Sequence, residues 1–168
     1  MDTSLDALLR HVTRPARYTG AEWNSRTKEW DTVRLRIALA YPDLYEVGIS
    51  SPGMASLYSL LGDRPDTLAE RVYAPQQDMA QALRGAARPL FTVESRRPLT
   101  DFDLLFVELP RELSWTTLLT ILDLGEIPLL QHNRGREDPL VVGWGAGATN
   151  PEPLADFLDL VLLGDAEG

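Results

Sequence analysis

The 168-residue chain is long enough to bury a core, and its apolar and charged fractions are those of a globular protein. Its formal net charge of −9 argues against a surface for duplex DNA or anionic membranes, because those contacts need clustered lysines and arginines. No apolar run reaches the roughly 18 residues of a membrane span, and the first residues do not resemble a signal peptide. We therefore predict a cytoplasmic protein with no membrane partner.

The residues that usually hold metals are scarce. The chain has no cysteine, so these residues cannot form a thiolate metal site or hold an iron–sulfur cluster. The two histidines, His11 and His132, are far apart in sequence and lie among polar residues. We predict that both are surface residues and that the chain has no metal ligands.

The first 33 residues lack the regular pattern of the rest. We predict that residues 1–33 form a helix and an irregular arm packed on a domain of residues 34–168. From Ser4 to Val12 the leucines have helical spacing, with Ser4 as the cap. The arm interleaves aromatic with basic side chains, which suits either stacking on single-stranded nucleic acid or pinning of the arm to the domain. Acidic residues dilute its positive charge and favour pinning, so nucleic acid is not an expected partner; the aromatics are Tyr18, Trp23 and Trp30.

Beyond Arg34, apolar strand-like runs alternate with helical patterns. Expected strands lie at 34–42, 70–75, 90–95, 101–109, 139–145 and 159–165. Expected helices lie at 54–63, 76–86, 114–125 and 150–158, with Ser51, Ser114 and Asn150 as N-caps. This alternation predicts an α/β fold. It is a doubly wound, mainly parallel sheet of five to six strands, Rossmann-like in the manner of flavodoxin or cobalamin-binding domains, covered on both faces.

Ligands of such sheets bind beyond the carboxyl ends of the strands, near the switch in strand order. The loops that matter are therefore residues 42–53, 110–113 and 143–153. The first of them has no G-x-G-x-x-G pattern, and no Walker lysine follows a glycine loop. Carboxylates gather in these loops and could act as an acid–base pair, or they could only cap loops and flank Arg111. We favour the structural interpretation and predict no catalytic residue; the carboxylates are Asp43, Glu46, Glu108 and Glu112.

Several long strings resemble the amino-terminal domain of a group of uncharacterised radical S-adenosylmethionine (radical SAM) proteins, in which a cobalamin-binding-like domain precedes the radical domain. The strings are "PARYTGAEWNS", "ALAYPDLYEVGISSPG", "LAERVYAPQQDM", "LFTVESRRPLTDFDLL" and "NPEPLADFLDLVLLGDAEG". The resemblance covers about residues 14–168 and implies a radical SAM domain of the same polypeptide, downstream of residue 168. It also implies that S-adenosylmethionine and a 4Fe-4S cluster bind there, at a C-x-x-x-C-x-x-C loop. This chain alone would not be an enzyme.

The resemblance also raises the question of cobalamin. Vitamin-binding domains carry D-x-H-x-x-G after the first strand, and here Asp43 and Gly48 match while Tyr45 replaces the histidine. A phenol, with a pKa near 10, is a poor cobalt ligand, so binding through a lower histidine is excluded. Binding without a lower protein ligand stays open.

A second departure lies after the fifth expected strand, where Trp144 interrupts a glycine pair. Its indole could fill the slot for the nucleotide tail or stack on a planar ligand, and we favour the first. Glu108 adds bulk and charge where the vitamin fold tends to place a serine. The candidate cofactor-binding residues implied by the resemblance are Asp43, Tyr45, Gly48, Glu108, Gly143, Trp144, Gly145 and Asn150.

Three functions follow from these patterns. The favoured one is a domain that docks on the radical SAM domain and shapes its substrate cleft, with weak or no cobalamin affinity. It predicts that Asp43, Tyr45, Gly48, Glu108, Trp144 and Asn150 line one cleft. The alternatives are a genuine cobalamin-binding domain without a lower histidine ligand and a non-enzymatic interaction domain.

Overall fold

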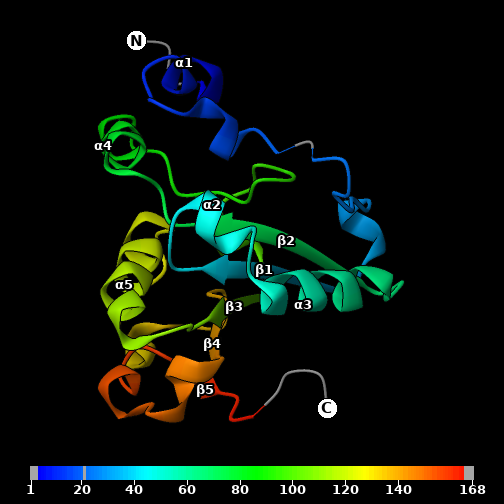
Figure 1. Cartoon of the computed structure of the whole chain (residues 1–168), viewed down its shortest axis with the longest axis vertical. Helices are drawn as coiled ribbons and strands as arrows, with labels where there is room; N and C mark the ends of the chain where they lie inside the picture. The colour runs from blue at the N-terminus through cyan, green and yellow to red at the C-terminus, as the bar shows by residue number, and fades with distance from the viewer. Residues whose placement is uncertain (1–3, 21, 165–168) are drawn as a thin grey trace.

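The computed structural model describes residues 4–20 and 22–164, and in them the chain forms one all-parallel sheet (Figure 1). Its five strands run in the order β2-β1-β3-β4-β5, so the order switches between β1 and β3. This is the predicted doubly wound, Rossmann-like α/β fold. The strands are β1 Leu35–Tyr41, β2 Thr67–Tyr73, β3 Leu104–Glu108, β4 Leu140–Trp144 and β5 Leu160–Val161.

The helices are short, and four of the predicted ones begin within two residues of the expected positions, whereas the short helix Tyr45–Gly48 lies in a segment that was expected to be a loop. At the start of α3 the Ser51 hydroxyl accepts the N–H of Met54, and Pro52 is the first helical residue, as predicted. At α1 the Ser4 side chain likewise accepts from Ala7. The α-helices are α1 Leu5–Leu9, α2 Tyr45–Gly48, α3 Pro52–Asp63, α4 Gln77–Gly85 and α5 Trp115–Leu124. The 3-10 turns are Pro15–Tyr18, Trp30–Thr32, Leu99–Asp101, Glu112–Ser114, Gln131–Asn133, Ala146–Thr149 and Glu152–Leu154.

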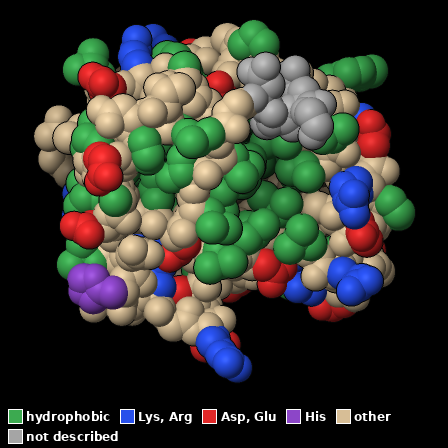
Figure 2. Space-filling model, turned by 90° about the horizontal axis from the view of Figure 1, so that it is seen from below, with side chains coloured by type: hydrophobic (Ala, Val, Ile, Leu, Met, Phe, Trp, Pro, Cys, Tyr) green, Lys and Arg blue, Asp and Glu red, His purple; other side chains and the backbone are tan. Residues whose placement is uncertain are grey.

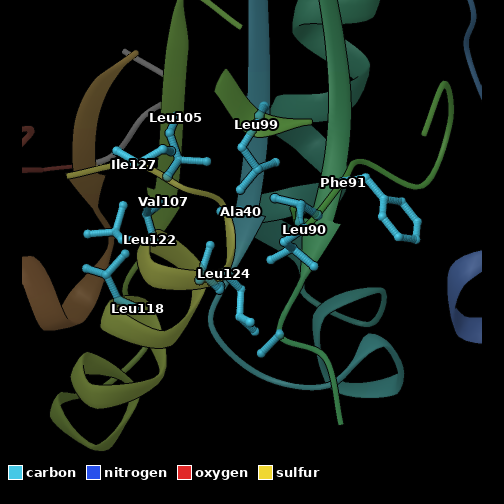
Figure 3. Close-up of a cluster of buried hydrophobic side chains, with 14 of the residues drawn as sticks. Ala40, Leu90, Phe91, Leu99, Leu105, Val107, Leu118, Leu122, Leu124 and Ile127 are labelled. Carbon is cyan, nitrogen blue, oxygen red and sulfur yellow. The ribbon is translucent and has the colours of Figure 1, made fainter. Parts of the chain in front are cut away.

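Two hydrophobic clusters lie on opposite faces of the sheet. On one face Ala40, Leu105 and Val107 pack against Leu118 and Leu122 of α5, and α4 joins the same cluster (Figure 3). On the other face α3 packs on β2 and β1. Figure 1 shows α3 and α5 on opposite sides of the strands. Among the described residues, α3 is the main helix on its face; it packs mostly on β2 and β1, and Tyr45 of the short helix α2 joins the same cluster.

The amino-terminal segment is held to the domain by its side chains. Helix α1 packs on α4, and its leucines belong to the larger cluster. Tyr18 is buried, and Trp30 makes an edge contact with Phe102 at 5.3 Å between ring centroids. Trp23 is fully exposed, so two of the three aromatic residues of the arm face the domain. The boundary between residues 33 and 34 stays a prediction.

One predicted strand is wrong. Residues 90–95 form only an isolated antiparallel bridge, from Phe91 to Pro98. The chain reverses at Arg96, which has φ of +60°, and the segment runs along the outer edge of β2. There the N–H of Val93 donates to the carbonyl of Arg71 at 2.8 Å, and the N–H of Arg71 donates to the Glu94 carboxylate at 2.7 Å. A side chain thus replaces a backbone acceptor, and the ladder stops.

The predicted helix at 150–158 is also wrong. Only the turn Glu152–Leu154 forms, and Asn150 makes no capping hydrogen bond. Two prolines, at 151 and 153, deprive this segment of backbone donors. Ser114 makes no side-chain cap either, because it ends the preceding 3-10 turn. Strand β5 is shorter than predicted, and residue 165 of that prediction lies outside the described residues.

Candidate functional site

The switch in strand order places the carboxyl ends of β1 and β3 side by side, and their two loops are joined there. Arg111 after β3 lies 3.3 Å from the carboxylate of Asp43 after β1. Asp43 also accepts the N–H of Leu44 at 2.8 Å, so it caps its own loop as the sequence suggested. The ion pair is largely exposed and contributes little stability. It does, however, bridge the place where this fold usually binds ligands.

Glu108, at the end of β3, occupies the amino terminus of α3. The Ser51 hydroxyl lies 2.9 and 2.8 Å from its two carboxylate oxygens and donates its proton to them. Burial raises the pKa of Glu108, while the hydrogen bonds from Ser51 and the Met54 N–H act in the opposite direction. A helix amino terminus attracts anions, and here the protein's own carboxylate takes that position.

Trp144, at the end of β4, fills the space beside Glu108. Its side chain is 7% exposed and stacks on Phe106 at 5.9 Å between ring centroids, with an interplanar angle of 20°. Helix α3 approaches this ring through Gly53, where an added Cβ would lie 2.8 Å from the indole and 3.1 Å from Glu108. The indole N–H is buried without a hydrogen-bond partner. The ring therefore acts as packing at this edge.

The glycines on either side of Trp144 serve close packing. A Cβ on Gly143 would lie 2.8 Å from Leu158 and 3.0 Å from Leu109. Gly145 has φ of +98°, a conformation that favours glycine, and an added Cβ there would lie 3.1 Å from the carbonyl oxygen of Leu109. These neighbours fill the region that the resemblance assigns to a nucleotide tail.

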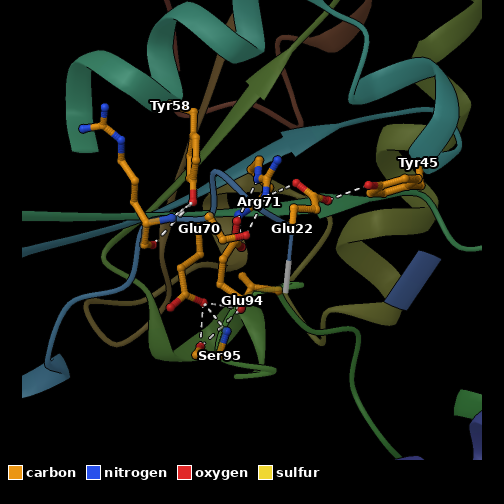
Figure 4. A network of polar contacts seen from close by, with 10 residues as sticks. Glu22, Tyr45, Tyr58, Glu70, Arg71, Glu94 and Ser95 are labelled. Carbon is orange, nitrogen blue, oxygen red and sulfur yellow. Dashed lines mark hydrogen bonds and ion pairs between the residues drawn. The ribbon is translucent and has the colours of Figure 1, made fainter. Parts of the chain in front are cut away.

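Tyr45 and Gly48 lie on α2 and face β2 rather than Trp144. The Tyr45 hydroxyl donates to Glu22 at 2.6 Å, and its ring meets Tyr73 edge-on at 5.2 Å (Figure 4). Burial and the Glu22 carboxylate raise the pKa of Tyr45 to about 12. Gly48 lines a cavity of about 160 Å³ beside Arg71, below the roughly 300–1,000 Å³ of a ligand pocket.

A buried polar network that the sequence did not indicate lies under this cavity (Figure 4). Arg71 pairs with Glu94 at 2.7 Å and with Glu22 at 2.6 Å. Burial raises the pKa of Glu94 even though Arg71 favours its charged form. Beside it Glu70 accepts from the hydroxyls of Thr92 and Ser95. These carboxylates are paired with protein donors and attach the arm and residues 92–95 to the edge strand β2.

The eight candidate residues therefore lie in three different parts of the structure. Asp43, Glu108 and Trp144, with both neighbouring glycines, lie along the carboxyl ends of β1, β3 and β4. Tyr45 and Gly48 belong to the β2 side. Asn150 is exposed and lines a shallow groove of about 330 Å³ with Arg111 and Leu113. Sequence reasoning missed Gly53 and Phe106 at this edge, and it predicted Ser51 only as an N-cap and not as the partner of Glu108; these roles depend on contacts between distant segments.

Comparison with known protein families gives a match over most of the chain. The family described as radical SAM proteins, N-terminal, matches residues 53–168. The chain belongs to this family. Membership implies an associated radical SAM domain, which uses S-adenosylmethionine and a 4Fe-4S cluster in the full protein. No curated protein and no solved structure matches the chain.

The family implies a 4Fe-4S cluster, and the resemblance raises the question of cobalamin. The side chains of this chain show whether it could hold either group. The cluster needs cysteine thiolates, which the sequence lacks. Cobalamin does not fit the arrangement that the resemblance implies, because Tyr45 is bound to Glu22 and leucines pack against Gly143. Within residues 4–20 and 22–164 no cluster of side chains could hold a metal ion, and no helix is long and apolar enough to cross a membrane. Both histidines are exposed, as predicted.

Proposed function

We propose that this chain is the docking domain of a radical SAM protein, which packs on the radical domain and shapes its substrate cleft with weak or no affinity for cobalamin. One observation carries the proposal. The edge of the sheet at which this fold binds ligands is filled by the protein's own side chains, Trp144 and Glu108 above all.

The energy needed to open this edge supports the proposal. Burying an indole removes on the order of 200 Å² from water, worth roughly 5 kcal/mol at 25 cal/mol per Å². A ligand that displaced Trp144 would have to offset this cost, which corresponds to more than about a thousandfold in affinity. Displacing Glu108 would also leave the Ser51 hydroxyl and the amino terminus of α3 without their partner.

Titration with hydroxocobalamin distinguishes this proposal from a cobalamin carrier. The purified protein is mixed with the vitamin and passed over a gel-filtration column while the visible spectrum is recorded. We expect the colour to elute with free vitamin. Colour that stays with the protein at near-equal stoichiometry would refute weak affinity and support the carrier without a lower ligand.

Reading the gene past codon 168 tests the link to a radical domain. The proposal predicts an open frame that encodes a C-x-x-x-C-x-x-C loop, because a 4Fe-4S cluster of this type takes its ligands from cysteines. A stop codon directly after Gly168, with no separate radical SAM chain that binds this one, would contradict it.

A further inference from the structure

Within residues 4–20 and 22–164, no α-helix covers the β3–β5 half of the sheet face that carries α3. Strand register places Leu104 beside Leu140 and Phe106 beside Val142, and the buried Val142 in turn lies beside Leu160, so these side chains share one face. Leu162 follows two residues after Leu160 and continues the row. We call the surface of Leu104, Phe106, Leu140, Leu160 and Leu162 the β3–β5 face.

This face is exposed and apolar. Leu140, Leu160 and Leu162 are 49%, 55% and 45% exposed, and Leu104 and Phe106 are partly buried. Figure 2 shows hydrophobic side chains gathered on the side of the molecule seen from below, the end of Figure 1 at which β5 lies. None of the five residues is charged, although the chain has a net charge of −9. A partner would therefore bind here by apolar contact and not by charge.

The sheet itself explains why a cover is needed. Parallel sheets occur almost only with both faces covered, usually by helices, because their strands are apolar on both sides. Here α4 and α5 cover one face, and α3 covers the β2–β1 half of the other. Contiguous apolar surface left on a protein of this kind marks an interaction site.

The family of the chain and the place where its described residues end indicate which partner covers this face. The family match names an N-terminal region and continues through residue 168. Leu162, directly after β5, still donates its N–H to the carbonyl of Gly143 at 2.9 Å, so the described chain ends beside this edge of the sheet. We infer that the radical SAM domain of the same polypeptide covers the β3–β5 face with an apolar surface. It thereby takes the position that a covering helix has in other parallel sheets. The inference rests on the proposed docking function and adds the surface by which docking occurs.

The test uses the full polypeptide with a protease site inserted after Gly168, cleaved after purification so that no covalent link remains. The two fragments of the unsubstituted protein are expected to elute together from gel filtration. Leu160→Glu combined with Leu162→Glu is expected to weaken their association by about 100-fold or more, because two half-exposed leucines lose apolar contact and two charges become buried. The matched control is Leu60→Glu, on α3, where the side chain is 57% exposed and away from this face.

Each result has one meaning. Separation of the double variant, with co-elution of the unsubstituted and Leu60→Glu proteins, supports the inference, provided that the variant fragment keeps the melting temperature of the unsubstituted one within a few degrees. Co-elution of all three overturns the inference and leaves docking standing, through another surface. Separation of the unsubstituted fragments overturns docking itself. Pairing of this chain with a second copy of itself, through the same leucines, would overturn the assignment of the partner.

Discussion

Replacing Trp144 by alanine tests whether this side chain fills the carboxyl edge. Truncating a buried tryptophan to alanine typically costs 3–5 kcal/mol, the lost transfer energy plus the cost of the cavity. Here the indole N–H is a buried donor without a hydrogen-bond partner, so its removal offsets about 1 kcal/mol of that loss. We therefore expect Trp144→Ala to lower the free energy of unfolding by about 3 kcal/mol.

Urea unfolding followed by circular dichroism measures this change without depending on tryptophan fluorescence. Trp144→Phe is the matched variant, because it keeps a ring against Phe106 and removes the unpartnered donor; its expected loss is below about 1.5 kcal/mol. Trp23→Ala, at a fully exposed position, is expected to stay within about 0.5 kcal/mol. A loss below about 1 kcal/mol for Trp144→Ala would show that the ring does not hold this edge closed.

Gly53, Glu46 and Tyr45 provide three further tests, each of a different contact. Gly53→Ala is expected to cost about 1–3 kcal/mol in urea unfolding, because its Cβ would lie 2.8 Å from Trp144; an unchanged midpoint would contradict this packing. Hydrogen bonds from Arg17 lower the pKa of Glu46 from 4.5 to about 2, so the stability that its charge contributes is present above pH 4.5 and lost as pH falls toward 2. The stability difference between the unsubstituted protein and Glu46→Gln should fade over that range in acid-unfolding curves, and a difference that is constant with pH would count against the ion pair. Tyr45→His recreates D-x-H-x-x-G but is expected to retain no cobalamin in gel filtration, and a coloured protein peak would contradict the account of the blocked edge.

Much of the fold could be predicted because local sequence and global structure agree. The nearly continuous apolar run of β1 predicts a strand buried on both faces, and Ser51 with Pro52 marks the start of α3. The predicted strand at residues 90–95 was wrong because their apolar pattern suits a strand, whereas the Glu94 side chain accepts the backbone N–H of Arg71 and ends the ladder.

The candidate site was harder to predict because its state depends on contacts between distant segments. That Trp144 interrupts a glycine pair is visible in the sequence. That it packs against Gly53 and Phe106 depends on the placement of α3 and on the register of β3 with β4. The bare β3–β5 face was likewise hidden, because which residues of β3, β4 and β5 share a face depends on the register of these strands.

Hydrogen–deuterium exchange, compared between the full polypeptide and the 168-residue chain, shows whether the radical SAM domain covers the β3–β5 face. We expect peptides from β4, β5 and residues 162–164 to exchange more slowly in the full polypeptide, because the radical SAM domain covers them, and we expect hydroxocobalamin to change neither pattern. Equal exchange of these peptides in both forms, together with protection of the loops after β1 and β3 by the vitamin, would contradict both expectations.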